Sequence, residues 1–139
     1  MISKKVFIAS DGFVAFIDRA HPKHIHAAAQ FRYFAQNSYQ IYTTIIALND
    51  AYQTFYNTIS PSVARDFLRA IELSSINLIY PEESDIKRSL RAVSTTQSAD
   101  LTFATVLSAT ICNKKSIPQV CTFSYFPALF GLQVFFLPM

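Results

Sequence analysis

Apolar residues follow two different periods along this chain of 139 residues, and the alternation between the periods predicts its order of elements. Residues 6–9, Val-Phe-Ile-Ala, form a short apolar run typical of a buried strand, and residues 13–18 continue as a helix. Ser10, Asp11 and Gly12 form the polar joint between them. Because open α/β sheets bind ligands at the carboxyl ends of their strands, we expect function to centre on this joint.

The rest of the chain repeats the alternation of helix and strand. Helical spacing of apolar residues predicts five further helices, and short apolar runs predict four further strands. The predicted helices are 23–37, 45–59, 61–74, 81–93 and 102–113, and the predicted strands are 40–42, 77–80, 119–122 and 133–137. Thr43 or Thr44, Ser60 and Thr102 are the expected caps of three of these helices.

The apolar stripes predict the buried face of each helix. Ile86, Leu90 and Val93 form the stripe of the fifth helix, and Asp50 lies off the stripe of the third. That third stripe consists of Ile45, Leu48, Tyr52, Phe55 and Ile59.

Crossovers between successive strands are mostly long enough for parallel pairing. The pattern therefore predicts an α/β fold, a three-layer α/β/α domain with a mostly parallel sheet of about five strands. We find no internal repeat and no linker, and we expect residues 1–139 to form one domain.

Composition narrows the class of protein. Hydrophobic residues make up 51% and charged residues 15%, which excludes an intrinsically disordered chain. With two glycines, the chain has no Gly-rich loop to hold phosphates. A net charge of +3 permits nucleic-acid binding but does not require it.

Two observations bear on the compartment. Cys112 and Cys121 form no CxxC motif and no disulfide framework, which suits a reducing cytosol. Residues 116–139 carry no charge, but prolines at 118, 127 and 138 interrupt them, so they indicate strand, loop and strand better than a membrane span. No signal peptide is recognised, and we expect a cytoplasmic protein without membrane association.

Several other groups have both a chemical and a structural interpretation. His21, His24 and His26 do not share one helix face, so a solvated helix start is favoured over a metal site. The two cysteines indicate buried structural thiols rather than a Cys–His nucleophile. An aromatic run could stack on RNA bases, although core packing or a dimer face is favoured; it comprises Phe123, Tyr125, Phe126, Phe130, Phe135 and Phe136.

In this order, the segments resemble the PIN domain, and most closely the toxin-type ribonucleases of the VapC kind. The resemblance covers nearly the whole chain and rests on the order and spacing of five segments. They are FVAFID at 13–18, HPKHIHAAA at 21–29, TTIIALNDAYQTF at 43–55, ADLTFATVLSAT at 99–110 and VCTFSYFPALFGLQVF at 120–135.

The resemblance implies a parallel sheet, frequent homodimers, an antitoxin-like partner and RNA cleavage with Mg²⁺ or Mn²⁺. A cluster of carboxylates suits that chemistry, because hard divalent cations bind carboxylate oxygens and the bound metal activates water.

The acidic positions of the family are largely replaced in this chain. Aligned without a gap, the first aspartate falls on Ala9, and Asp11 takes a position where the family has Asn or Ser. The acid of the third helix is retained as Asp50. The two remaining aspartates fall on Thr105 and Ser124. Three of four acidic positions therefore lack a carboxylate.

We therefore interpret the chain as a degenerate PIN-like protein of toxin–antitoxin type, with lost or much reduced ribonuclease activity and a retained binding role. An antitoxin-like protein, RNA and a second copy remain open as partners, and no cofactor is expected. The alternative is an active Mg²⁺- or Mn²⁺-dependent endoribonuclease with a rearranged site of Asp11, Asp50 and Asp100. Structural interpretations of two of these acids also stay open: Asp11 as a local turn or helix cap, and Asp50 as a plain exposed acid.

Overall fold

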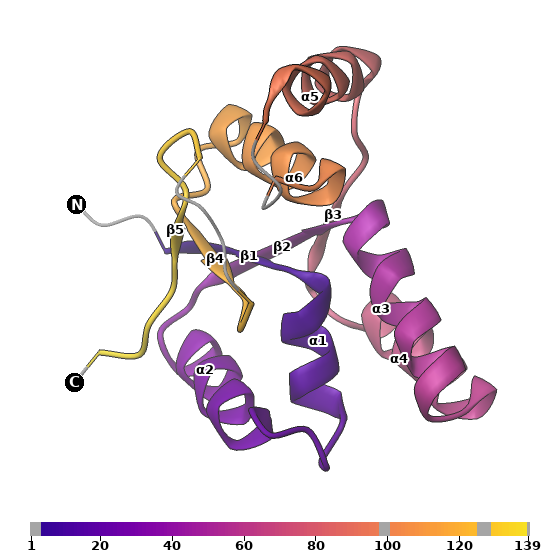
Figure 1. The fold of residues 1–139 in the computed structure, drawn as a ribbon. Coiled ribbons are helices and arrows are strands. Elements are labelled where there is room, and N and C mark those ends of the chain that lie inside the picture. The colour runs from indigo at the N-terminus through magenta and orange to yellow at the C-terminus, as the bar shows by residue number, and fades with distance from the viewer. Residues whose placement is uncertain (1–3, 98–100, 125–128, 139) are drawn as a thin grey trace.

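The computed structural model describes residues 4–97, 101–124 and 129–138, and Figure 1 shows its fold. One sheet contains five strands in the order β3-β2-β1-β4-β5, with every neighbouring pair parallel. The strands are β1 (Lys5–Ile8), β2 (Gln40–Thr44), β3 (Asn77–Ile79), β4 (Gln119–Cys121) and β5 (Gln133–Val134). The predicted fold class is confirmed, and the sheet is parallel throughout.

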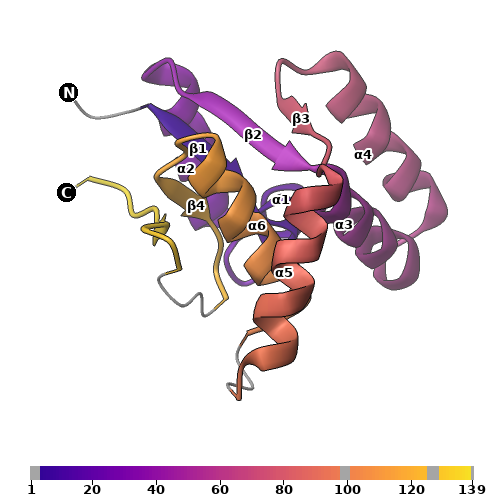
Figure 2. The same cartoon turned by 90° about the horizontal axis from the view of Figure 1, so that it is seen from above.

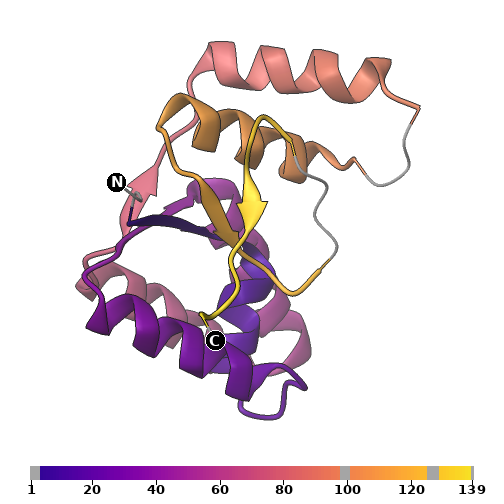
Figure 3. The same cartoon turned by 90° about the vertical axis from the view of Figure 1, so that its left-hand side faces the viewer.

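Six helices cover the two faces of this sheet (Figures 1 and 3). One layer contains α1 (Ser10–Ile17), α2 (His24–Gln36), α3 (Ile45–Thr58) and α4 (Pro61–Leu73), and the other contains α5 (Glu83–Thr95) and α6 (Phe103–Lys114). Seen from above, α5 runs alongside α6 (Figure 2). No helix in the described residues has the length and apolar character needed to cross a bilayer.

The central strand β1 divides the core in two. Successive side chains of a strand point to opposite faces, so Val6 and Ile8 pack in the core on the α1–α4 side. Phe7 packs on the other side, with Val120 and Cys112. All three β1 side chains are fully buried, which explains the continuous apolar run in the sequence.

Helix α1 begins directly after the strand, so the predicted joint is wrong: Ser10, Asp11 and Gly12 form the first helical turn. Ala9 is the N-cap and supplies no side-chain hydrogen bond. A Cβ atom at Gly12 would lie 2.8 Å from the backbone oxygen of Cys121, so only glycine allows α1 to approach β4 this closely. This approach turns Asp11 toward the end of β4.

The predicted helix caps are confirmed. The hydroxyl groups of Thr44, Ser60 and Thr102 accept hydrogen bonds from the amides of Ala47, Val63 and Thr105. Thr43 does not cap α3, because β2 extends to Thr44; its hydroxyl instead donates to the Ile8 carbonyl at 2.9 Å and ties β2 to β1.

The predicted buried face of α5 is wrong. Asp85 and Ser89 are 6% and 0% exposed, whereas Ile86 and Leu90 are 36% and 54% exposed. The polar face is held inward because Asp85 closes a capping box with Glu82 and lies 3.3 Å from the Lys114 ammonium of α6. The predicted buried face of α3 is wrong at its two ends. Ile45 and the C-cap residue Ile59 are exposed, and the small residues Ala47 and Ala51 are buried instead.

Candidate functional site

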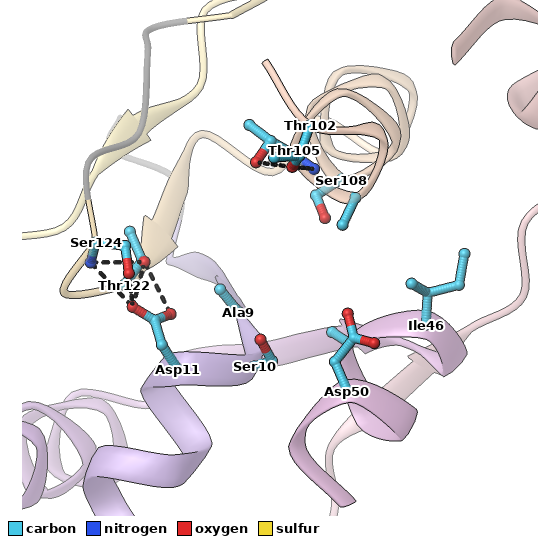
Figure 4. Close-up of a pocket in the computed structure, with 12 residues that line it drawn as sticks. Ala9, Ser10, Asp11, Ile46, Asp50, Thr102, Thr105, Ser108, Thr122 and Ser124 are labelled. Atoms are coloured by element: carbon cyan, nitrogen blue, oxygen red, sulfur yellow. Dashed lines mark hydrogen bonds between the residues drawn. The ribbon is translucent and has the colours of Figure 1, made fainter. Parts of the chain in front are cut away.

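A cavity of about 210 Å³ lies at the carboxyl end of the sheet, where β1, β4 and α6 meet (Figure 4). It is lined by Ala9, Ser10, Asp11, Ile46, Ala47, Asp50, Thr102, Ala104, Thr105, Ser108, Thr122 and Ser124. All five positions singled out by the alignment, Ala9, Asp11, Asp50, Thr105 and Ser124, are in this set. The sequence therefore predicted the place of the cavity, although the helix boundary beside it was wrong.

The Asp11 carboxylate is bound by the segment that follows β4. Thr122 Oγ1 donates to both carboxylate oxygens at 2.8 Å. Oδ2 also accepts from the amides of Phe123 and Ser124, at 2.8 and 2.9 Å, and from Ser124 Oγ at 3.0 Å. In Figure 4 the side chain points at Thr122 and Ser124 rather than at Asp50.

These bonds give Asp11 a structural role that neither sequence interpretation contained. Four donor groups hold this carboxylate: the Thr122 hydroxyl bonds both oxygens, and the other three donors bond Oδ2 alone, so Oδ1 is bonded only by Thr122. The side chain neither caps α1 nor forms a local turn; it joins the start of α1 to a segment 111 residues away. We call this set of bonds, from Asp11 to Thr122, Phe123 and Ser124, the Asp11 clasp.

The carboxylate of Asp50, unlike that of Asp11, has no hydrogen-bond partner among the described residues. It lies in the second turn of α3, and its carboxylate points into the cavity (Figure 4). The carboxylate accepts no hydrogen bond from any residue in the described ranges. Asp50 is exposed as a residue, as one of its two sequence interpretations held, and partial desolvation of the carboxyl raises its pKa. Among the described lining residues, Asp50 is thus the carboxylate without a hydrogen-bond partner, whereas Asp11 is held by four donors.

Helix α6 supplies a row of hydroxyl groups opposite Asp50. Thr102, Thr105 and Ser108 are three residues apart, so they follow one side of the helix into the cavity. Thr102 Oγ1 donates to Thr105 Oγ1 at 2.9 Å. Ser108, and Ser10 on α1, form no hydrogen bond through their hydroxyls within the part of the chain that the structure describes. Sequence analysis missed Ser108, although it follows Thr105 at helical spacing, whereas Ser10 belongs to the segment on which it expected function to centre.

The donor set does not fit the divalent metal site that the resemblance implies. Mg²⁺ requires near-octahedral oxygen ligands and is usually held through carboxylates. Ala9 offers no ligand, Asp11 is engaged in the clasp, and Ser124 Oγ already donates to Asp11. Within 4–97, 101–124 and 129–138, no three or more His, Cys, Asp or Glu side chains are grouped so that they could hold a metal. Asp100 lies outside the described residues.

The histidines have local structural contacts. His24 Nδ1 lies 3.0 Å from the Ala15 carbonyl, and His21 Nδ1 accepts from the Lys23 amide. His26 is exposed on α2. The three form no metal cluster in the described part of the chain.

The cysteines are buried, as expected. Burial raises the pKa of both Cys112 and Cys121 to about 12, which disfavours the thiolate that a nucleophile requires. The Cys121 thiol also donates to Gln30 Oε1 at 3.0 Å.

The described residues of the aromatic run are divided between the core and the surface. Phe135 is buried against Phe34, with ring centroids 4.8 Å apart, whereas Phe130 and Phe136 are exposed. Tyr125 and Phe126 lie outside the described residues.

A second hollow was missed by sequence analysis. It is an apolar groove of about 600 Å³ between α1, α2 and α4. Phe16 of α1 and Phe31 of α2 stack in it with ring centroids 4.0 Å apart, and Arg32 lies on its lining. We call this hollow the apolar groove. Its full lining is Phe13, Phe16, Ile17, Ala28, Phe31, Arg32, Ala35, Ile41, Phe67, Ala70, Ile71, Ser74, Ser75 and Ile76.

The fold is that of a VapC-like PIN domain. It superposes on VapC20 of Mycobacterium tuberculosis, whose structure is described as that of a sarcin–ricin loop cleaving toxin, with a TM-score of 0.76. The match covers 86% of this chain and 89% of VapC20, at 13% sequence identity. No family model and no curated protein matches the sequence. At this identity, the likeness establishes the fold.

Proposed function

We propose that this chain is a toxin-type PIN-like protein that has lost most or all of its metal-dependent ribonuclease activity and acts by binding. The proposal is supported by a VapC-like fold in which the acidic positions have been replaced. The observation that carries it is the Asp11 clasp, because four donors turn the Asp11 carboxylate toward the segment after β4 and leave Asp50 as the one described lining carboxylate without a partner.

The physical reason for lost cleavage is charge. The family pattern places about four carboxylates around the metal, whereas here Asp50 and the engaged Asp11 carry a charge of about −1 to −2. A divalent cation held this weakly neither lowers the pKa of an attacking water nor screens the scissile phosphate. The alternative, an active Mg²⁺- or Mn²⁺-dependent endoribonuclease, is favoured by one observation: Asp11 and Asp50 line the same cavity.

The test is RNA cleavage with and without chelator. We expect no Mn²⁺- or Mg²⁺-dependent cleavage that EDTA abolishes in the unmodified protein. Cleavage that EDTA abolishes and that Asp50→Asn or Asp11→Asn removes would refute the proposal and favour the alternative.

A gain-of-function variant sharpens this test. The triple change Ala9→Asp, Thr105→Asp and Ser124→Asp restores the family's carboxylates, and its neutral control carries Asn at the same three positions. Because Ser124 Oγ is 3.0 Å from Asp11 Oδ2, the new carboxylate would repel Asp11 unless a cation lies between them. We expect Mn²⁺ to raise the melting temperature of the Asp variant and not that of the Asn control.

For the retained binding role, we propose that the apolar groove takes an amphipathic helix of an antitoxin-like protein, with an acidic residue facing Arg32. The groove is lined mainly by apolar side chains of three helices, a common way to bind a partner helix. Arg32 has no ion pair among the described residues and would attract an acidic side chain. Co-purification with a genomically adjacent small protein should be lost in Phe31→Asp and weakened in Arg32→Glu. A complex unaffected by both changes would refute this role of the groove.

We also propose that the protein forms a homodimer through α5. Ile86 and Leu90, four residues apart on one face of α5, are exposed, and so is Tyr80 shortly before the helix. Glu83 in the first turn is paired with Lys87 of the same helix at 2.9 Å, and Arg91 lies two turns further on, so in an antiparallel pair Arg91 of each copy would face the Glu83 end of the other across a twofold axis. Sedimentation at micromolar concentration should give a dimer, and Leu90→Arg a monomer; a monomeric unmodified protein would refute the proposal.

A further inference from the structure

The cavity has two chemically different walls. Asp50, on α3, can only accept hydrogen bonds while it is ionised. The wall formed by α6 presents Thr105 and Ser108, and Ser10 points into the same space from α1 (Figure 4). Thr105 Oγ1 already accepts from Thr102, so its own proton remains available for donation.

These donors and acceptors determine which chemical groups the cavity can bind. A ligand atom near Asp50 must donate, and a ligand atom near Thr105 or Ser108 should also be able to accept. A hydroxyl group does both, and two adjacent hydroxyls can bridge the two walls. A diol can thus bind Asp50, Thr105 and Ser108 at the same time.

Other ligand classes match less well. Phosphate would meet the Asp50 charge, and none of the described lining residues is Lys or Arg. An ammonium group could bind Asp50 but has no acceptor for the Thr105 and Ser108 protons. A divalent cation lacks the carboxylates that it requires.

The volume of the cavity also favours a single sugar ring. A volume of about 210 Å³ is smaller than the 300–1,000 Å³ typical of sites for drug-sized ligands. It suits one sugar ring, with any attached group at the mouth.

We propose that this cavity binds the neutral cis-diol of a ribose, as carried by a nucleoside. Asp50 accepts from the two diol hydroxyls, and Thr105 and Ser108 donate to the same oxygens. The inference rests on the proposed function, since it requires the cavity to be free of a divalent metal.

The experiment measures binding of adenosine by calorimetry and ligand-observed NMR, in EDTA. The comparison compounds are 2′,3′-dideoxyadenosine, which lacks the diol, and inorganic phosphate. We expect millimolar binding of adenosine, at least tenfold weaker binding of the dideoxy compound, and no binding of phosphate.

Single substitutions in the cavity test whether adenosine binds there. Asp50→Asn and Ser108→Ala should each weaken adenosine binding, by about tenfold for the charged group because hydrogen bonds to charged groups are stronger. Ser84→Ala removes an exposed hydroxyl from α5, away from the cavity, and should change nothing. Circular dichroism confirms that each variant is folded.

Equal binding of adenosine and its dideoxy counterpart, tighter binding of phosphate, or unchanged binding in both cavity variants would overturn the inference. Since all arms contain EDTA, these results are independent of the cleavage assay. The proposed function fails only if chelator-sensitive cleavage is found.

Discussion

Removing the Asp11 carboxylate should destabilise the protein, because Asp11 lines the cavity but is held by hydrogen bonds from another segment. Asp11→Ala leaves four donors without their acceptor: the Thr122 and Ser124 hydroxyls and the amides of Phe123 and Ser124. Asp11→Asn keeps one acceptor oxygen in place.

The loss of unfolding free energy depends on which of the four donors water can reach once the carboxylate is removed. Ser124 is exposed, so water replaces much of what it loses, whereas Thr122 is buried and Phe123 partly buried. Two bonds to a charged group, at about 1.5 kcal/mol each, give a loss of about 3 kcal/mol for Asp11→Ala. Asp11 also lies in the first turn of α1, where an acid contributes about 0.3–1 kcal/mol. For Asp11→Asn we expect about 1–2 kcal/mol, because one acceptor oxygen remains.

For a chain of this size, Asp11→Ala should lower the melting temperature by about 10 °C. Urea and thermal unfolding in EDTA measure the effect without any contribution from metal. Asp50→Asn is the matched control, because it removes the other cavity carboxylate, which has no hydrogen-bond partner in the described residues. Equal effects of the two changes, or an Asp11→Asn variant as stable as the parent, would refute the clasp.

Three further outcomes are expected. Gly12→Ala should destabilise the protein by about 1–3 kcal/mol in urea unfolding, because the new Cβ meets the Cys121 backbone, whereas unchanged stability would mean that α1 can shift freely. Asp50→Asn should raise stability at pH 7. The folded-state pKa of Asp50 lies above the unfolded value of 3.8, so the folded protein loses stability as pH rises through that window, and the gain from Asn should vanish below it in melts over a pH series. Cys112 and Cys121, with their pKa raised to about 12, should not react with a disulfide reagent at pH 8 until denaturant is added; rapid reaction of the native protein would contradict their burial.

The sheet and the place of the cavity could be predicted because they depend on local signals. Apolar runs separated by helices of crossover length define a parallel sheet, and the carboxyl ends of its strands meet at one edge. Ala9 and Ser124 each follow a strand, and Thr105 lies in the first turn of a helix capped by Thr102, so the order of elements brings them together.

The parts that could not be predicted depend on contacts between distant segments. Ser-Asp-Gly is typical of a loop, yet it forms a helical turn here because Asp11 binds a segment beyond β4 and Gly12 fits against Cys121. In α5, hydropathy favoured Ile86 and Leu90 as the buried face. Asp85 is buried instead, because its partner Lys114 lies on another helix, which periodicity cannot reveal.

The position of β1 in the middle of the sheet has a consequence for biosynthesis. Val6 pairs on one side with Ile41, which is made soon afterwards, but on the other side with Gln119, near the end of the described chain. Until that segment leaves the ribosome, one edge of a strand with three consecutive apolar residues, Val6 to Ile8, stays open, and exposed strand edges recruit other chains. Such distant pairing also slows folding. A ribosome that stalls before residue 119 therefore releases an aggregation-prone chain, and the yield of this protein should depend on chaperones that cover β1 during synthesis.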